Sequence, residues 1–198
     1  MARKTLRRGL WTMTAWLAVC AWGMLLGDAH GRFTEVASEA GIDFRHTSGA
    51  VGDRYMPETM GAGCAFLDFD NDGLLDILFA NGRAWNAASD DATPRLYRNV
   101  GGGQFTDATR AAGLDHAMHG MGLAIADIDN DGDSDIFFSN VGRDRLFRNR
   151  GDGSFEDITS ASGIDQDGAG WSASATFFDY DRDGLLDLFV CGYVEGSP

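Results

Sequence analysis

The sequence predicts an all-β fold built from a repeated unit of four short strands, and three observations support this. The pattern D-x-D-x-D-G-x-x-D occurs three times, at residues 68–76, 127–135 and 179–187. Aliphatic and aromatic residues flank each copy, as is typical of β-strands. Further segments recur fifty residues apart, a spacing that indicates a structural repeat. We call the three acidic segments aspartate loops 1, 2 and 3.

The first and second strands of each unit are predicted directly before and after an aspartate loop. Ala65–Leu67 leads into loop 1, and Ile77–Phe79 follows it. Ile136–Phe138 and Leu188–Val190 stand in the equivalent places after loops 2 and 3. Each loop is therefore expected to join two strands.

The third and fourth strands are predicted from the segments that recur. Arg95–Asn99 returns as Arg145–Asn149, and Phe105–Thr109 returns as Phe155–Thr159. A Gly-rich turn separates the two strands in each unit. Four strands in a unit of 40 to 50 residues are typical of a β-propeller blade. The sequence thus predicts a β-propeller.

The domain organisation follows from these repeats. We divide the chain into a signal peptide (1–29), a leader with an outer strand and a connecting segment (30–60), blade 1 (61–119), blade 2 (120–170) and a partial blade 3 (171–198). The outer strand is predicted at Phe33–Ala37, because this segment resembles the strand that begins at Phe105. A closed propeller needs at least four blades. We therefore expect an incomplete ring here, an amino-terminal part whose remaining blades belong to a longer parent chain.

Residues 1–29 have the pattern of a secretory signal peptide. Four basic residues within the first eight positions precede an uncharged, largely apolar stretch from Leu10 to Gly27. Small residues precede the predicted cleavage site after Ala29. The mature protein would be extracellular or periplasmic, without a membrane span. The alternative is that the segment remains uncleaved as a membrane anchor.

The aspartate loops predict up to three Ca²⁺ sites. Four or five carboxylates within nine residues repel one another unless a cation lies among them, and oxygen ligands at this density suit Ca²⁺. Glycine at position six allows the loop to turn back on the ion. A leucine at position seven offers only its backbone carbonyl. The predicted ligands are Asp68, Asp70, Asp72, Leu74 and Asp76 in loop 1, Asp127, Asp129, Asp131, Asp133 and Asp135 in loop 2, and Asp179, Asp181, Asp183, Leu185 and Asp187 in loop 3.

The aspartate loops have two other interpretations, an EF-hand and a solvated hairpin end without a metal. An EF-hand needs a bidentate Glu at position twelve and a helix on either side, but that position holds Phe79, Phe138 or Val190. Solvated hairpin ends also favour Asp and Gly, although three copies in one register argue against this. Loop 3 has Arg182 at position four, so we expect it to bind Ca²⁺ more weakly than loop 2.

The charge of the chain limits its partners. The formal net charge is −14 at pH 7. Thirteen of the 30 acidic residues lie in the three aspartate loops, so much of the acidity belongs to the predicted metal sites. No basic stripe is present to neutralise phosphates, and nucleic acid is therefore excluded as the expected partner.

The repeated units resemble the FG-GAP/VCBS repeats of integrin α-chain propellers and of many secreted bacterial proteins. More narrowly, Ile42–His46 and Tyr55–Gly61, followed by loop 1, resemble the opening of the cartilage acidic protein and ASPIC/UnbV group. The resemblance implies an FG-GAP-type propeller in which the loop aspartates bind Ca²⁺. This chain departs from the pattern because it lacks the later blades and the carboxy-terminal domain of that group.

The function expected from these features is that of a secreted binding or adhesion module, not an enzyme. Its partner would be an extracellular protein or a carbohydrate, contacted through loops such as 82–94. The alternative is the calcium-stabilised scaffold of a polysaccharide lyase or hydrolase, for which the candidate acids and bases are His46, Glu58, His116 and His119. We interpret His46 and Glu58 as a structural hydrogen-bonded pair, and His116 and His119 as solvated loop residues.

The two cysteines of the predicted mature region, Cys64 and Cys191, lie on predicted strands outside loops 1 and 3. We interpret them as small buried strand residues. A disulfide between them would have to join two blades that a propeller holds apart.

Overall fold

The fold is all-β, as predicted. The structure, a computed structural model, describes residues 33–50, 52, 54–83, 93–164 and 170–195. The chain divides into two compact units, Met1–Val36 and Ala37–Pro198. The predicted signal peptide lies outside the described residues, as does most of the loop 82–94. No helix in the described part of the chain is long and apolar enough to cross a membrane.

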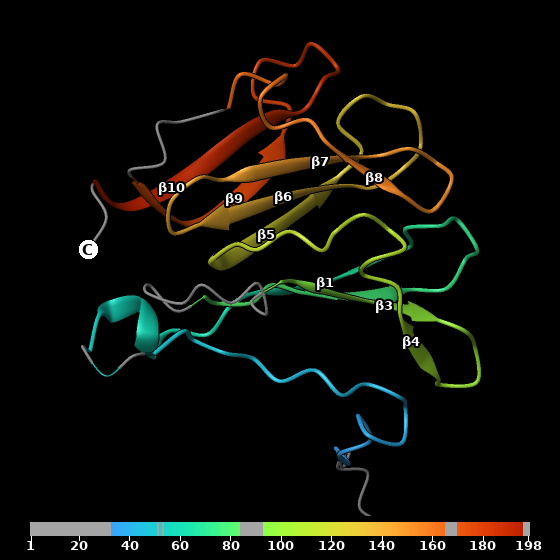
Figure 1. Cartoon of the computed structure of the whole chain (residues 1–198). Helices are drawn as coiled ribbons and strands as arrows, with labels where there is room; N and C mark the ends of the chain where they lie inside the picture. The colour runs from blue at the N-terminus through green and yellow to red at the C-terminus, as the bar shows by residue number, and fades with distance from the viewer. Residues whose placement is uncertain (1–32, 51, 53, 84–92, 165–169, 196–198) are drawn as a thin grey trace, which may run out of the picture. The chain divides into compact units, whose positions relative to one another are not determined.

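Three antiparallel sheets follow one another along the second unit (Figure 1). The first sheet contains β1 (Cys64–Leu67), β2 (Asp76–Phe79), β3 (Arg95–Asn99) and β4 (Phe105–Asp107). The second contains β5 (Gly120–Ala126), β6 (Asp135–Asn140), β7 (Arg145–Asn149) and β8 (Phe155–Asp157). The third contains β9 (Gly170–Phe178) and β10 (Asp187–Glu195). These sheets do not close into a ring in the described residues, and the strands within each pair in chain order, as in propeller blades.

Each aspartate loop joins the first two strands of its sheet. Position nine of each loop pairs with the residue just before position one, as in Leu67 with Asp76, Ala126 with Asp135, and Phe178 with Asp187. The described residues contain one short 3-10 helix, η1 (Met56–Thr59), which lies before β1 and flanks no loop. The structure therefore excludes the helical flanks of an EF-hand.

The core lies between the sheets. All six residues of β6 are buried. Ile136 and Phe138 pack into the cluster shared with the first sheet, which contains Leu78 and Leu96. Phe137 packs into the cluster shared with the third sheet. Because side chains alternate along a strand, β6 is apolar on both faces and fastens the second sheet to both of its neighbours.

The first strands of successive sheets approach one another closely. Gly63, just before β1, donates its N–H to the carbonyl of Met121 on β5 at 2.8 Å. A Cβ on Gly122 would lie 2.9 Å from the carbonyl oxygen of Ala173 on β9. Glycine is therefore needed on β5, because any side chain would push β9 away.

A turn that contains a left-handed glycine occurs three times, once before the first sheet and once after the fourth strand of each complete sheet. Gly41, Gly113 and Gly163 adopt φ of 82°, 75° and 78°. Ala40 accepts a hydrogen bond from the N–H of Phe105 at 2.8 Å, and Ala112 accepts the equivalent bond from Phe155 at 2.9 Å. The chain therefore repeats structurally before the first complete sheet.

The predicted outer strand at Phe33–Ala37 is not formed. Residues 33–36 have no strand structure, and residues 37–41 form the turn described above. A strand requires hydrogen bonds to a neighbour, and no described strand pairs with this segment. The sequence similarity to Phe105 therefore reflects the turn and not the strand.

Candidate metal centres

The three aspartate loops share one backbone conformation. Position four lies in the left-handed region in every loop, with φ of 57° at Asn71, 59° at Asn130 and 65° at Arg182. Position six does the same, with φ of 83° at Gly73, 94° at Gly132 and 89° at Gly184. Glycine tolerates this region without strain, and all three loops have glycine at position six.

The carboxylate at position one holds the loop closed. Asp68 accepts hydrogen bonds from the N–H groups of Asp72 at 3.1 Å and Gly73 at 2.9 Å. Asp127 and Asp179 accept the equivalent pairs in loops 2 and 3. Both oxygens are thus fixed by backbone donors, so the backbone of the loop itself positions the first carboxylate.

The carboxylate at position nine ties the loop to the third strand. Asp76 is fully buried, and it accepts bonds from the N–H groups of Phe69 at 3.1 Å and Asn99 on β3 at 2.7 Å. Asp135 accepts the same two bonds from Ile128 and Asn149. In loop 3 the exposed Asp187 accepts a bond from Tyr180 at 2.8 Å.

Burial raises the pKa of Asp76, and the negative charges of Asp70 and Asp72 raise it further, while the two N–H bonds oppose the shift. The pKa of Asp135 is raised for the same reasons, again with burial first. A carboxylate in this setting is unfavourable unless positive charge is supplied nearby.

Three carboxylates converge in each loop. One oxygen each of Asp68, Asp70 and Asp76 lies within 4.8 Å of the other two, and the same holds for positions one, three and nine of loops 2 and 3. The other two groups are Asp127, Asp129 and Asp135, and Asp179, Asp181 and Asp187. Asp70 Oδ1 is buried and has no hydrogen-bond partner. This orphaned oxygen and the all-oxygen donor set fit a hard cation.

The remaining predicted ligands do not belong to these groups. At position five, Asp72, Asp131 and Asp183 each accept a bond from the N–H of position seven, at 2.8 to 2.9 Å. The side chains at position seven are exposed at Leu74 and Leu185. In loop 2, position seven is Asp133, which accepts a bond from Asn71 of loop 1 at 2.5 Å. Carboxylate oxygens therefore converge from three of the five predicted positions.

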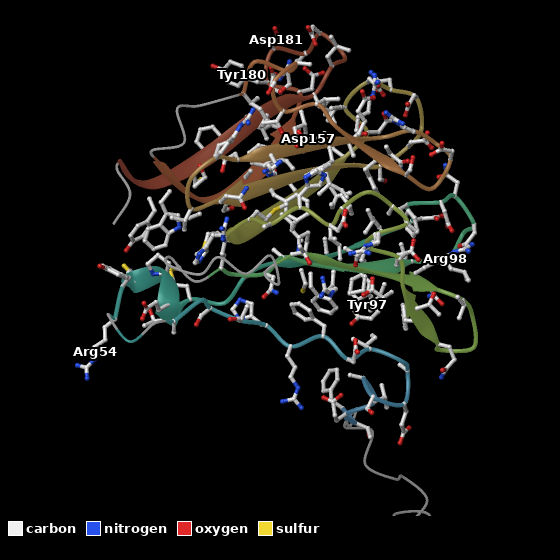
Figure 2. The ribbon with its side chains drawn as sticks, viewed as in Figure 1. Arg54, Tyr97, Arg98, Asp157, Tyr180 and Asp181 are labelled. Atoms are coloured by element: carbon white, nitrogen blue, oxygen red, sulfur yellow. The ribbon has the colours of Figure 1, made fainter. Side chains whose placement is uncertain are left out.

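In both complete sheets, an arginine on the third strand approaches the aspartate loop of the same sheet. The sequence analysis did not predict this contact. Arg98 Nε lies 2.5 Å from Asp70 Oδ2, and a terminal nitrogen lies 3.2 Å from Asp72 Oδ2. Figure 2 shows Arg98 at the loop end of its sheet. Arg148, its counterpart on β7, lies 4.0 Å from Asp129. The signal available in the sequence was the repeated Arg at the fourth position of Arg95–Asn99 and Arg145–Asn149.

Neighbouring loops also contact one another, which spacing alone does not reveal. Asn130 of loop 2 donates to the carbonyl of Gly184 in loop 3 at 3.3 Å. Asn149 donates to the carbonyl of Phe69 in loop 1 at 2.9 Å. Together with the bond from Asn71 to Asp133, these contacts join the three loops in a row.

The side chains of His46, Glu58 and His119 accept hydrogen bonds from the backbone. His46 Nε2 accepts from the N–H of Ala62 at 3.3 Å, and Glu58 accepts from the N–H of Arg54 at 3.0 Å. His119 is only 7% exposed and accepts from the N–H of Arg83. The interpretation of His119 as a solvated residue was wrong, because the connection before β5 is packed between sheets. Partly buried His116 packs on the ring of Phe147.

The cysteines also differ from expectation. Cys64 and Cys191 are both free thiols, and both are exposed, not buried. On β1, Cys64 and the exposed Phe66 lie on one face of the strand, and the buried Leu67 lies on the other. The face that carries Cys64 is therefore poorly covered.

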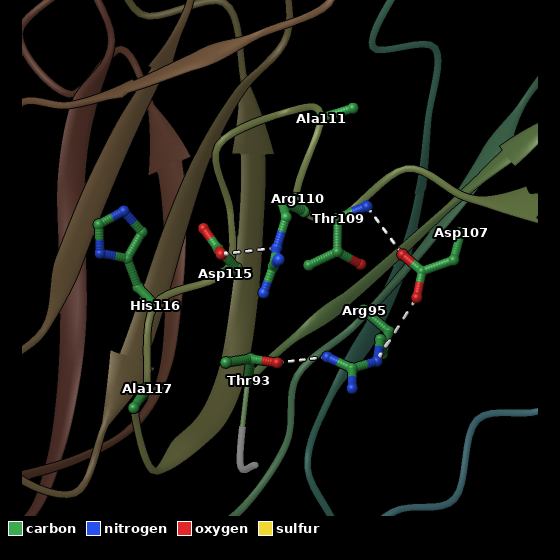
Figure 3. A pocket seen from close by; sticks show the side chains of 9 residues that line it. All are labelled: Thr93, Arg95, Asp107, Thr109, Arg110, Ala111, Asp115, His116 and Ala117. Atoms are coloured by element: carbon green, nitrogen blue, oxygen red, sulfur yellow. Dashed lines mark hydrogen bonds and ion pairs between the residues drawn. The ribbon is translucent and has the colours of Figure 1, made fainter. Parts of the chain in front are cut away.

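A hollow of about 940 Å³ lies between the fourth strand of the first sheet and the connection to β5 (Figure 3). Its charged groups are paired: Arg95 with Asp107 at 3.6 Å, and Arg110 with Asp115 at 3.3 Å. Asp107 also accepts a bond from the N–H of Thr109, and Asp157 makes the same bond to Thr159 in the second sheet. The pair of Arg95 with Asp107 also recurs, as Arg145 with Asp157 at 2.7 Å, so these two contacts belong to the framework of the repeat.

Comparison with known proteins agrees with this geometry. No curated protein matches the chain. The FG-GAP-like repeat matches twice, over residues 68–138 and 127–190. Each match begins at position one of an aspartate loop, and together they cover more than half of the chain. The chain therefore belongs to the FG-GAP-like repeat family.

Proposed function

We propose that this chain is a calcium-binding β-propeller module of a secreted protein, and that it acts in adhesion or in binding another molecule. The observation that carries the calcium part is the convergence of three carboxylates in every loop, at the same positions and on the same backbone. The orphaned oxygen of Asp70 supports it. A divalent cation would offset the burial and the charge repulsion that raise the pKa of Asp76 and Asp135.

The residues proposed to hold Ca²⁺ are the aspartates at positions one, three and nine of each loop. Position five and the carbonyl of position seven would complete the shell, since Ca²⁺ takes six to eight oxygens. Bound Ca²⁺ would supply positive charge between the first two strands and, through position nine, brace the third. Its proposed role is structural: it would hold each blade in shape.

The proposal of a binding role, and not a catalytic one, rests on the contacts that polar side chains make within the fold. Outside the loops, His46 and Glu58 accept backbone hydrogen bonds, and the arginines of the hollow in Figure 3 pair with aspartates. These side chains are thus used to hold the fold, which favours a binding module over a catalyst. The proposed partner is an extracellular protein or a carbohydrate. We also propose the narrower ASPIC/UnbV group, on the residues Ile42–His46 and Tyr55–Gly61.

The calcium proposal is tested by thermal unfolding of the full-length chain in chelator and in millimolar Ca²⁺. A site filled at a hundred times its Kd stabilises the fold by about 2.7 kcal/mol, so the melting temperature should rise by several degrees. An equal melting temperature in both conditions would remove calcium from the proposal.

Matched variants separate loop chemistry from general charge. The triple variant Asp70→Asn, Asp129→Asn, Asp181→Asn removes one carboxylate from each group and should abolish most of the calcium response. The control replaces three exposed acids outside the loops: Glu39→Gln, Asp115→Asn and Asp152→Asn. The control should keep the response, because it changes the net charge equally but leaves the carboxylate groups intact.

Secretion is proposed from the composition of residues 1–29 and needs its own test. Expression in a host with a secretory pathway, followed by amino-terminal sequencing of the exported protein, should find a mature chain that starts at His30. A product that retains residues 1–29 and sediments with membranes would instead favour the anchored form.

A further inference from the structure

The arginine on the third strand is paired differently in the two complete blades, and this difference lies beside the proposed calcium sites. We propose that the residue opposite this arginine on the fourth strand, Thr106 in blade 1 and Glu156 in blade 2, sets the Ca²⁺ affinity of the aspartate loop in its own blade. The inference rests on the proposed function and extends it. It names positioning residues that do not contact the ion themselves.

In blade 1 the arginine is committed to the loop. Arg98 on β3 contacts both Asp70, at 2.5 Å, and Asp72, at 3.2 Å. Its cross-strand partner on β4 is Thr106, a neutral side chain with no carboxylate to attract a guanidinium. The fixed charge of Arg98 therefore occupies two carboxylates that Ca²⁺ would need.

In blade 2 the same arginine is held away from the loop. Arg148 on β7 faces Glu156 on β8 in the same register. It donates to Glu156 at 2.9 Å and lies 4.0 Å from Asp129. Arg150 adds a second pair with Glu156 at 3.5 Å. Glu156 therefore competes with the loop for Arg148.

The energetic consequence is a difference in calcium affinity between the loops. Ca²⁺ binding to loop 1 must compete with Arg98 for the charge of Asp70 and Asp72, each of which Arg98 contacts through Oδ2. Binding to loop 2 competes only with the long pair between Arg148 and Asp129. An ion pair between half-exposed side chains changes a binding constant by a modest factor. Two such pairs therefore lower the Ca²⁺ affinity on the order of tenfold. Loop 1 should bind Ca²⁺ more weakly than loop 2.

The experiment is a Ca²⁺ titration of the full-length, isotope-labelled chain, followed at the backbone amides of Gly73 and Gly132. Each glycine donates to the first aspartate of its own loop, so the two signals report the two sites separately. In the unmodified chain, the midpoint for Gly73 should lie at the higher Ca²⁺ concentration.

Four variants test the role of the partner residue. Arg98→Gln and Thr106→Glu should each lower the Gly73 midpoint on the order of tenfold and leave Gly132 unchanged. Glu156→Thr should raise the Gly132 midpoint, because Arg148 is then free to reach Asp129. Arg148→Gln, the matched control for Arg98→Gln, should change the Gly132 midpoint less, because this arginine is already diverted.

A double-mutant cycle distinguishes diversion of Arg98 from the direct attraction of a new carboxylate for Ca²⁺. If Glu at 106 acts through Arg98, adding Thr106→Glu to Arg98→Gln should give little further gain. Equal gains in both backgrounds, or an unchanged Gly73 midpoint in Arg98→Gln, would overturn the inference while leaving the calcium sites in place. If neither glycine responds to Ca²⁺ in the unmodified chain, the proposed function fails, and this inference falls with it.

Discussion

Arg182 stands at position four of loop 3, where loops 1 and 2 have Asn71 and Asn130. All three residues adopt left-handed φ values between 57° and 65°. Asparagine tolerates this region, whereas a side chain such as that of arginine is strained there by about 1–2 kcal/mol. The aspartate loop thus imposes its backbone even where the residue opposes it.

Replacing Arg182 by asparagine should therefore stabilise the protein. We expect Arg182→Asn to raise the free energy of unfolding by about 0.5–1 kcal/mol, measured by denaturant unfolding in chelator. The control is Arg45→Asn, at an exposed position whose φ is not left-handed. A gain of the same size at Arg45 would show that charge, not backbone strain, is responsible.

His119 makes the stability depend on pH. Burial lowers the pKa of His119 below its usual 6.5, and the nearby His46 lowers it further. The unfolded chain therefore binds a proton at higher pH than the folded chain does, and stability falls as pH drops below about 6.5 towards the folded-state pKa. Above pH 6.5 the contribution of the neutral ring is complete.

The variant His119→Gln isolates this effect. Glutamine can accept the hydrogen bond from Arg83 but does not titrate, so the loss of stability between pH 7.5 and pH 5.5 should be smaller than in the unmodified chain. Denaturant unfolding at the two pH values measures the difference. An equal loss in both proteins would assign the pH dependence to other groups.

Position nine of the aspartate loop shows how an element is held by one buried carboxylate. Asp76 needs both oxygens as acceptors, because Phe69 and Asn99 donate to different atoms. An asparagine would turn an N–H donor towards a backbone donor. Asp76→Asn should therefore cost about 1–3 kcal/mol even in chelator.

Asp187 provides the matched comparison for Asp76. It occupies the same position in loop 3, but it is exposed and accepts a bond from Tyr180. Asp187→Asn should cost about 1 kcal/mol or less by the same unfolding measurement, because water can replace the lost partner. Equal costs at both positions would mean that the bond to β3 contributes nothing.

At the level of elements, the sequence predicted what depends on local pattern. The strands beside the loops and the recurring third and fourth strands were correct, because alternation, glycine and the aspartate motif are local signals. The strand at Phe33–Ala37 was wrong, because a strand depends on a partner that local pattern does not supply. Arg98 was missed and His119 was wrongly interpreted as solvated, because their roles depend on residues that register and packing bring near, such as Asp70 and Arg83.

Across the whole molecule, position two of aspartate loops 1 and 2 packs against the sheet that follows. Phe69 of loop 1 is 3% exposed and stacks on Phe155 of the second sheet, with ring centroids 6.3 Å apart. Ile128 of loop 2 packs in the cluster shared with the third sheet. Tyr180 of loop 3 is 77% exposed and projects at the rim in Figure 2. The same position is thus buried in loop 1, partly buried in loop 2 and exposed in loop 3, which no described sheet follows.

This arrangement makes the loop both a candidate metal site and a joint between sheets. Phe69→Ala would remove a buried ring from the joint and should lower the free energy of unfolding by about 3–5 kcal/mol. Tyr180→Ala, at the equivalent position, should change it by about 0.5 kcal/mol or less. Both are measured by denaturant unfolding in chelator, so that bound calcium does not contribute. If Phe69→Ala cost no more than Tyr180→Ala, the sheets would be held together by their strands alone, and position two would not couple them.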